Sequence, residues 1–508
     1  MMRSLFSGVS GLKSHQTRMD VIGNNIANVN TTGFKSSRTT FADTLSQTLT
    51  GASSPQENLG GTNPKQIGLG VGVASVDLLF TDGSVQSTGK NTDLCLSGNG
   101  LFVVKQGSQT YYTRDGAFAF DADGNYVLPS SGLYVQGWMA KDGVLASNGA
   151  ITNITIPSGK SMAAKATEKV TYTGNINAAA PTILSMTQVD NTVTPAQTTT
   201  TSTAKASYTA EAKKPVTIKM SDGSSVTQTS GTYTVGYSNP VTTTVKFYDE
   251  LGNAHNVPLY FTKTATSSTA GNTWTVSVLP DISKNSTTIT EADGSTTTVT
   301  MASTALQFST EGKLLSGSSS PSLTLTNGAG PWTSAGSTSG TGTGTGTGGT
   351  GTGTGLGSST GVDVSTISFD TLTQYSGSST VNGTADGNAA GTLSSVSVDS
   401  SGIITGTYTN GVRQKEAQVA VAQFTNASGL TKTGNSLYQE SNNSGTANVK
   451  TASDLGVTIT PSALEMSNVD IANEFSDMII TQRGFQSNSK IITVGDEMLE
   501  TQIGRAHV

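Results

Sequence analysis

An apolar residue recurs every seven positions near both ends of this chain, and the long stretch between the ends lacks the pattern. The repeat consists of Leu5, Leu12, Met19 and Ile26 at the start, and of Ile471, Met478, Phe485, Ile492 and Leu499, flanked by Phe475, at the finish. A strict seven-residue repeat places one apolar stripe along a helix and favours left-handed supercoiling against a partner helix. The ends therefore predict helices that bury these residues against each other or against copies of the chain.

The composition of the intervening residues favours β-structure. Only 12% of the residues are charged, compared with about 25% in an average globular protein. The 59 glycines and the abundant Thr and Ser fit extended strands joined by tight turns. A chain of 508 residues is too long for one core, so we expect three or more domains. The net charge of −6 argues against a nucleic-acid-binding surface, which would be basic.

Cysteine content and hydropathy limit where the chain can act. Cys95 is the single cysteine, so no intramolecular disulfide forms, and its position between two leucines predicts a buried strand residue. No apolar run reaches the roughly 18 residues of a membrane-spanning helix. Residues 1–16 contain too many polar side chains for the apolar core of a signal peptide. We expect a cytoplasmic protein, or one exported with its N-terminus intact.

The pattern along the chain predicts a multidomain protein with mainly β outer domains and an α-helical coiled-coil inner domain formed by the N- and C-terminal helices. Strand-like runs separated by Asp-Gly and Gly-Asn turns begin at Ile67. The expected divisions are a helical core (1–33 with 468–508), a connecting arm (34–66 with 456–467), a β-rich domain (67–160 with 364–455) and a β-rich outer part (161–363) that includes a Gly/Thr tract at 340–355.

Local signals suggest where the two helices begin and end. The first is predicted over Ser4–Thr32, with Gly33 as its C-terminal glycine. For the second, Ser467 is the expected cap and Asp470 the acid of a capping box. The first helix is basic overall and the second acidic, which favours them as neighbours. The alternative is two unrelated solvated faces.

Catalytic and metal-binding patterns are missing from the sequence. His15, His255 and His507 lie in different segments, and we expect each to be polar surface. Residues 121–125 imitate the start of a calcium loop, but Tyr126 and Gly132 stand where the loop needs Gly and Glu, so a β-turn is predicted. The glycines of 68–72 lack a following helix and a Lys, and indicate a closely packed strand. We expect no enzyme activity, no cofactor and no metal.

Two long motifs resemble a known family. Residues 24–35 read NNIANVNTTGFK and residues 464–492 read LEMSNVDIANEFSDMIITQRGFQSNSKII. Both are similar to the terminal signatures of the flagellar rod and hook family of bacterial axial proteins, and they occur in the family's order. Inner matches are FTDGSVQSTG at 80, GNGLFVVK at 98, YDELGNAH at 248 and FTNASGLTKTGNSLY at 424. The motif residues carried over are Asn24, Asn25, Asn28, Asn30, Gly33, Phe34, Ser467, Asn468, Asp470, Gln482 and Arg483.

The resemblance implies a structural homopolymer outside the cell. Hook-type members form a short curved tube that joins the motor rod to the filament as a universal joint, with paired terminal helices around a central channel and β-domains outside. The implied partners are other copies of the chain, rod proteins, a hook cap, hook–filament junction proteins and the flagellar type III export apparatus. Neither nucleic acid nor membrane insertion is implied. Residues 41–45 (FADTL) resemble the short export signal of such subunits, although an apolar anchor in the arm explains them equally well.

Length and the outer β-part make the chain more similar to hook members than to rod members, which are generally shorter. The alternatives are a distal-rod or hook-associated junction protein and, in another class, a secreted β-rich adhesin. An adhesin would need neither matched helices nor paired signatures. A DNA sequence that encodes residues 503–508 matches a common sequencing-library adapter. We therefore expect that these residues are an artefact and that the natural C-terminus is different.

Overall fold

The computed structural model describes residues 2–55, 60–146, 149–249, 251–290, 296–315, 321–327, 362–364 and 366–506. It contains two compact units, which we describe separately. Unit 1 consists of residues 1–160 and 393–508, and unit 2 of residues 161–392. The Gly/Thr tract at 340–355 lies outside the described residues.

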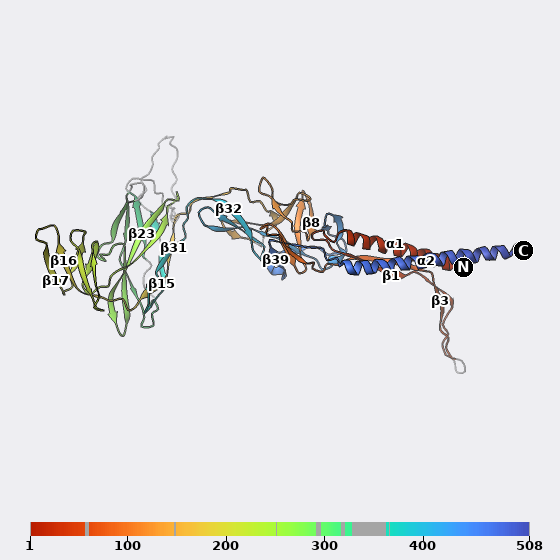
Figure 1. Ribbon diagram of the computed structural model, residues 1–508, viewed down its shortest axis with the longest axis horizontal. Helices are drawn as coiled ribbons and strands as arrows, with labels where there is room; N and C mark the ends of the chain where they lie inside the picture. The colour runs from red at the N-terminus through yellow and green to blue at the C-terminus, as the bar shows by residue number, and fades with distance from the viewer. Residues whose placement is uncertain are drawn as a thin grey trace, which may run out of the picture. The chain divides into compact units, whose positions relative to one another are not determined.

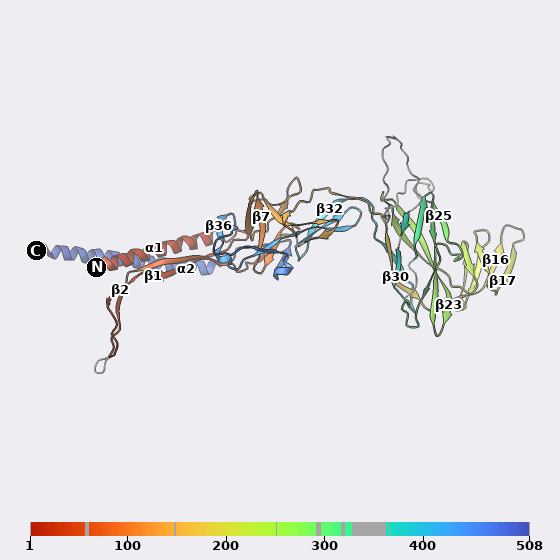
Figure 2. The same cartoon turned by 180° about the vertical axis from the view of Figure 1, so that it is seen from behind.

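The two ends of the chain form helices in unit 1, as the seven-residue repeats predict. Helix α1 spans Met2–Ala27 and helix α2 spans Ile471–Ala506, and Figures 1 and 2 show them side by side. The first helix ends five residues before the predicted Thr32. There Asn28 N bonds to the carbonyls of Asn24 and Asn25, and its side-chain amide donates to the Asn24 carbonyl, which closes the last turn.

The segment after α1 folds into a long antiparallel arm. Strand β1 (Ser37–Asp43) pairs with β4 (Val71–Leu78), and beyond them β2 (Ser46–Thr50) pairs with β3 (Lys65–Gly68). The β1–β4 part packs along α1, whereas β2–β3 projects away from the helices in both views (Figures 1 and 2). Residues 67–80, predicted as the start of the β-rich domain, therefore belong largely to this arm.

The rest of unit 1 is a β-body whose main sheet has the order β32-β33-β34-β11-β7-β8-β37-β36. Its strands are β32 (Gly391–Val398), β33 (Ile403–Tyr408), β34 (Arg413–Val419), β11 (Leu133–Lys141), β7 (Leu101–Gln106), β8 (Gln109–Thr113), β37 (Leu437–Gln439) and β36 (Thr431–Gly434). Smaller strands attached to it or near it are β9 (Ala119–Phe120), β10 (Tyr126–Leu128), β12 (Val144–Leu145), β13 (Thr152–Asn153), β35 (Val421–Gln423) and β38 (Asn448–Lys450).

Two short strand pairs connect this β-body to the helices. Strand β6 (Leu94–Ser97) pairs with β39 (Thr458–Pro461), and β5 (Val85–Ser87) pairs with β40 (Ala463–Glu465). Cys95 of β6 is buried, as its apolar neighbours predict. Strand β40 ends only a few residues before α2, so the β-body fixes the point from which that helix starts.

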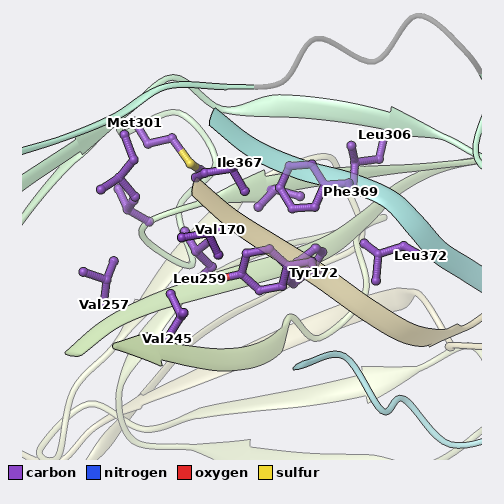
Figure 3. Packing of buried hydrophobic residues seen from close by; sticks show 14 of the residues in the cluster. Val170, Tyr172, Val245, Val257, Leu259, Met301, Leu306, Ile367, Phe369 and Leu372 are labelled. Atoms are coloured by element: carbon purple, nitrogen blue, oxygen red, sulfur yellow. The ribbon is translucent and has the colours of Figure 1, made fainter. Parts of the chain in front are cut away.

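Unit 2 is built of several small sheets around one larger core. Strand β15 (Lys169–Asn177) lies between β30 (Thr366–Tyr375) and β31 (Asn382–Ala385). A second four-stranded sheet consists, in order, of β22 (Val241–Tyr248), β23 (Ala254–Ser267), β24 (Gly271–Ser277) and β27 (Thr304–Gln307). Figure 3 shows Tyr172 of β15 among Phe369 and Leu372 of β30 in this core. Residues 366–392, which the sequence assigned to the first β-rich domain, therefore belong to unit 2.

The remaining strands of unit 2 follow the alternating patterns seen in the sequence. In β22 (Val241–Tyr248) every second residue is buried, including Val245 and Phe247. The other strands are β14 (Ser161–Met162), β16 (Ile183–Asp190), β17 (Gln197–Ser202), β18 (Ser207–Ala210), β19 (Val216–Met220), β20 (Ser225–Gln228), β21 (Gly231–Thr234), β23 (Ala254–Ser267), β24 (Gly271–Ser277), β25 (Ser286–Thr290), β26 (Thr296–Met301), β27 (Thr304–Gln307), β28 (Leu323–Asn327) and β29 (Val362–Val364).

Candidate assembly site

Helices α1 and α2 run antiparallel, and contacts along their length fix the register. Near the start of α1, a Cβ atom added at Gly495 would lie 2.7 Å from Cδ2 of Leu5. Farther along, Arg18 and Asp477 form an ion pair of 3.0 Å. At the other end, the Asn25 amide donates to Oε1 of Glu474 at 2.9 Å.

The surface that joins the two helices consists mainly of small and polar residues. A Cβ atom at Gly11 would lie 2.7 Å from Nδ2 of Asn488, and one at Gly8 would lie 3.3 Å from Cγ1 of Ile492. These glycines let the two backbones approach closely. Of the predicted apolar stripes, Leu5 meets Gly495 and Ile492 meets Gly8, so the stripes take part in the contact together with small and polar residues.

The predicted apolar residues of α1 are only partly covered in the single subunit. Leu5, Leu12, Met19 and Ile26 are all half-buried. Seven-residue steps shift position by about 20° per repeat on a straight α-helix, so such a stripe drifts around the helix. The partly exposed side chains of these residues thus remain available to a neighbour.

On α2 this drift divides the predicted stripe. Ile471, Phe475 and Phe485 remain exposed, with 47% exposure at Phe475 and 40% at Phe485. Met478, Ile492 and Leu499 are half-buried. Exposed and half-buried members thus alternate from Ile471 to Phe485, and the last two members, Ile492 and Leu499, are both half-buried.

A second set of apolar side chains is exposed on α2 and was not predicted as part of the stripe. Ile480 is 61% exposed, and Ile479, Ile491 and Met498 are also exposed. A groove of 330 Å³ lies here, lined by Ser4, Ser487, Lys490, Ile491, Val494, Gly495 and Met498. We call all the exposed apolar residues of this helix the α2 apolar surface: Ile471, Phe475, Ile479, Ile480, Phe485, Ile491 and Met498.

The two terminal motifs meet where the helices join the β-body. Asn25 is buried, its amide donates to the Ser37 carbonyl at 2.9 Å, and its Oδ1 accepts from Ser37 N at 3.0 Å. Asn468 accepts from Ser36 N at 2.8 Å and donates to the Leu79 carbonyl at 2.8 Å. One asparagine from each terminal motif thus hydrogen-bonds to the backbone of Ser36 or Ser37, where the chain enters the arm.

Gly33 is required by its backbone conformation and its surroundings. Its φ is +64°, and a Cβ atom there would lie 2.4 Å from Asp115 N. Gly33 N donates to the Glu465 carbonyl at 2.8 Å. This glycine therefore brings the turn after α1 against both the β-body and the strand that precedes α2.

A buried ionic cluster stabilises the same junction. Nζ of Lys35 lies 2.6 Å from Oε1 of Glu465, and Nη1 of Arg114 lies 3.0 Å from Oε2. Asp82 adds a partly exposed carboxylate, 3.4 Å from Arg114. Burial lowers the pKa of Lys35, while the carboxylate of Glu465 acts in the opposite direction. Breaking such a buried cluster leaves uncompensated charge and is strongly destabilising.

The second helix is capped by a different residue than the sequence suggested. Asp470 Oδ1 accepts from Ala472 N at 2.9 Å and from Asn473 N at 3.3 Å, so Asp470 is the N-cap. The prediction of Ser467 as the cap is wrong. Its hydroxyl accepts from Val469 N at 3.3 Å, before the helix begins.

The remaining motif residues do not gather at one point. Phe34 is buried, with Nζ of Lys432 3.9 Å from its ring centroid. Asn24 and Asn30 are exposed and Asn28 is half-buried, all at the C-terminal end of α1. Gln482 and Arg483 are exposed on α2, where Arg483 donates to Gln486 at 3.3 Å.

The arm carries the residues that resemble an export signal. Phe41 is half-buried on β1, with its ring centroid 5.9 Å from that of His15 of α1. Leu45, where β1 gives way to β2, is 74% exposed. Phe41 thus anchors the arm to the helix, while Leu45 stays uncovered.

Two of the three histidines are not polar surface, contrary to the sequence-based expectation. His255 is buried on β23, with its Nε2 atom 3.8 Å from Asp249 Oδ2, because the alternation of that strand turns it inward. His15 is half-buried between α1 and α2. His507 lies outside the described residues, and α2 is described as far as Ala506.

Residues 121–125 form a turn, as predicted. Asp121 Oδ1 accepts from Asp123 N at 3.0 Å and from Asn125 N at 2.7 Å, between β9 and β10. Within the described part of the chain, no three His, Cys, Asp or Glu side chains are grouped as metal ligands. None of the helices described is long and apolar enough to cross a membrane.

Sequence reasoning missed several residues that position the site. Gly11 and Asn488 belong to no apolar pattern, and Arg114 and Glu465 are single charges in unrelated segments. The one available signal was the spacing of Glu474, Thr481, Asn488 and Gly495, which repeats every seven residues like the apolar stripe. A polar and small-residue repeat beside an apolar one indicates two different contact faces.

Four protein-family models match separate parts of the chain. "Flagella basal body rod protein" matches residues 5–35 and "Flagellar basal body rod FlgEFG protein C-terminal" matches 460–505. "Flagellar hook protein FlgE/F/G D1 domain" matches 95–178, and "Flagellar basal body protein FlaE D2 domain" matches 237–388. The first two contain α1 and α2.

Curated relatives align with nearly the whole chain. The flagellar hook protein FlgE of Treponema pallidum (strain Nichols) is 36% identical over 514 residues, covering 99% of each chain. That of Borreliella burgdorferi is 37% identical over 508 residues, covering 98% of each. That of Escherichia coli (strain K12) is 29% identical over 97% of this chain and 98% of the relative. With this similarity and the mainly β fold with paired terminal helices, the chain belongs to the flagellar hook protein family of bacteria.

Proposed function

We propose that this chain is the structural subunit of a flagellar hook and that it polymerises through its paired terminal helices. The observation that carries the proposal is the α2 apolar surface, which stays uncovered although the helix pair is closed. A monomer gains nothing by exposing this many large apolar side chains on an ordered helix. Copies of the chain are the partners that an extended, repeating surface fits best.

The energetics favour many modest contacts over one strong contact. Fully burying a large apolar side chain contributes about 1.5–3 kcal/mol, and these residues are already partly covered by their own helix. Covering the rest of each would therefore add about 1 kcal/mol. Repeated over several residues and several neighbours, this is enough to hold a polymer whose single contacts remain reversible.

The β-parts have a different role in this proposal. Exposed Thr and Ser pairs line the strands of unit 2, such as Thr187 with Thr201 and Thr217 with Thr227. Polar surfaces of this kind make small, hydrated contacts that allow relative movement between neighbours. A tube held by apolar helices inside and by polar β-domains outside can bend while it stays continuous, as a universal joint must.

The proposal also includes the partners and the export route that the resemblance to this family implies. The ends of such a tube would meet rod proteins on one side, and a hook cap or junction proteins on the other. Export through the flagellar type III apparatus, without a cleaved signal, would use the arm that carries Phe41 and the exposed Leu45. The role is structural and involves no catalysis.

Electron microscopy of the purified full chain after induced polymerisation tests the proposal. The expected product is a curved tube made by this chain alone. A straight tube would favour a distal-rod role. If the chain assembles only in the presence of a second protein, a junction role would be favoured. A chain that remains monomeric under all polymerising conditions contradicts the proposal.

A further inference from the structure

His15 lies where three elements of unit 1 meet. It is on α1, its ring faces Gly484 of α2, and its edge approaches the ring of Phe41 on β1. A Cβ atom at Gly484 would lie 2.7 Å from Cε1 and 2.8 Å from Nε2 of His15. The imidazole thus fills the space that the glycine leaves, and it contacts both the second helix and the arm.

One nitrogen of this ring is buried without a partner. Nδ1 of His15 has no hydrogen-bond acceptor or donor among the described residues. In the neutral ring that atom can remain an unprotonated nitrogen at modest cost. In the imidazolium it becomes an N–H donor, and a buried donor without an acceptor is destabilising.

The charges near the ring also oppose protonation. Arg18 lies one helical turn away on α1 and repels a positive charge on His15. Asp477 of α2 is the nearby carboxylate, but it is already paired with Arg18 at 3.0 Å. The other charged residues close in sequence to this contact are Lys13 and Asp20 of α1, Arg483 of α2, and Arg38 and Asp43 of β1. Asp77 of β4 pairs with Arg38, and the remaining charged residues of the two helices lie farther along them.

We propose that the contact of α1, α2 and β1 is a proton-sensitive closure, in which neutral His15 holds the three elements together and its protonation loosens them. The closure is a property of the single subunit. Only its consequence for the polymer, whose helices would separate more easily in acid, depends on the proposed function.

The direction of the pH effect follows from the surroundings of the ring. Burial, together with Arg18, lowers the pKa of His15 below its ordinary value of 6.5. The open state therefore binds a proton more readily than the closed state. The stability that the closure contributes is complete above about pH 6.5 and falls as the pH drops below it.

Glu474, at the other end of the helix pair, titrates with the opposite sign. Its pKa is raised, chiefly by burial, so acid favours the closed state through this residue. The response of the wild-type chain to acid therefore combines the titration of His15 with the opposite titration of Glu474. A variant that removes only the His15 titration separates them.

Hydrogen–deuterium exchange of the full chain, read by mass spectrometry, tests the proposal. Wild type, His15→Gln and the control His255→Gln, whose histidine lies in unit 2, are compared at about pH 7.5 and about pH 5.5. Comparing the chains at one pH cancels the intrinsic pH dependence of exchange. We expect equal protection of α1 and α2 at the higher pH. At the lower pH, both helices should exchange severalfold faster in wild type and His255→Gln than in His15→Gln.

If α1 and α2 of His15→Gln already lack exchange protection at the higher pH, His15→Phe replaces it as the neutral variant. His15→Phe keeps an uncharged ring against Phe41. An equal response to acid in wild type and in the neutral variant overturns the proposal. Failure of the chain to form tubes at either pH contradicts the proposed function and leaves the exchange result unaffected.

Discussion

Nζ of Lys35 and Oε1 of Glu465 lie 2.6 Å apart, although 430 positions separate the two residues in the chain. Their side chains are 0% and 1% exposed. One residue follows α1 and the other precedes α2, so this pair fixes both helices to the same point of the β-body. Arg114 shares the carboxylate, which makes Glu465 the centre of the cluster.

Glu465→Gln should destabilise unit 1 by about 3–5 kcal/mol, because two buried cations lose their common partner. Lys35→Met should cost less, since Glu465 keeps Arg114 at 3.0 Å. Urea denaturation of the purified variants measures both. The control is Asp77→Asn, which removes the exposed 3.6 Å pair with Arg38 and should cost less than about 1 kcal/mol. Equal losses for Glu465→Gln and the control would contradict the role of the cluster.

Gly484→Ala should push the helices apart, because the new methyl group would meet the His15 ring at 2.7 Å. Overpacking of this kind costs about 1–3 kcal/mol and should reduce or abolish tube formation. The matched control is Gly23→Ala, where a Cβ atom meets nothing within 4 Å, and which should stabilise α1 by about 0.5–1 kcal/mol. Thermal unfolding and sedimentation of polymers measure the two effects. Normal assembly of Gly484→Ala would show that the close contact is not needed.

Asp470→Ala should weaken the start of α2 by about 0.5–2 kcal/mol, the usual cost of losing an N-cap. Ser467→Ala should have a smaller effect on the helix, since its hydroxyl contacts only Val469 N before the helix begins. Amide exchange over the first turn of α2 distinguishes the two variants. A larger loss of protection in Ser467→Ala than in Asp470→Ala would restore the assignment made from the sequence.

Phe485→Asp and Leu12→Asp should each prevent polymerisation while both units stay folded, because one residue is exposed and the other half-buried in the single subunit. Circular dichroism checks the fold, and light scattering under polymerising conditions follows assembly. Gln486→Asp introduces the same charge at an exposed polar position of α2 and should assemble. Polymers of normal length from Phe485→Asp would contradict the role of the α2 apolar surface.

The sequence predicted the features that repeat and missed those that depend on single residues. Both helices follow from their seven-residue spacing. Asp470 was recognised as important but given the wrong capping role, because Ser467 and Asp470 both fit a capping pattern. Only the backbone geometry shows which of them begins the helix.

The contact between the helices was beyond sequence reasoning for a physical reason. An apolar stripe indicates which face avoids water, but not whether its own chain or another copy covers it. Here Gly8, Gly11 and Asn488 form the contact within the chain, and much of the stripe is left for other copies. The buried pairing of Glu465 could not be predicted either, since a lone charge gives no sign of its partner hundreds of residues away.

The most direct test of the account is an electron-microscopy density map of polymers formed by the chain, at a resolution that shows side chains. We predict that α1 and α2 form the inner wall, with Phe475, Ile480 and Phe485 buried against helices of neighbouring copies. A polymer in which these three side chains still face solvent, with copies joined only through unit 2, would contradict it.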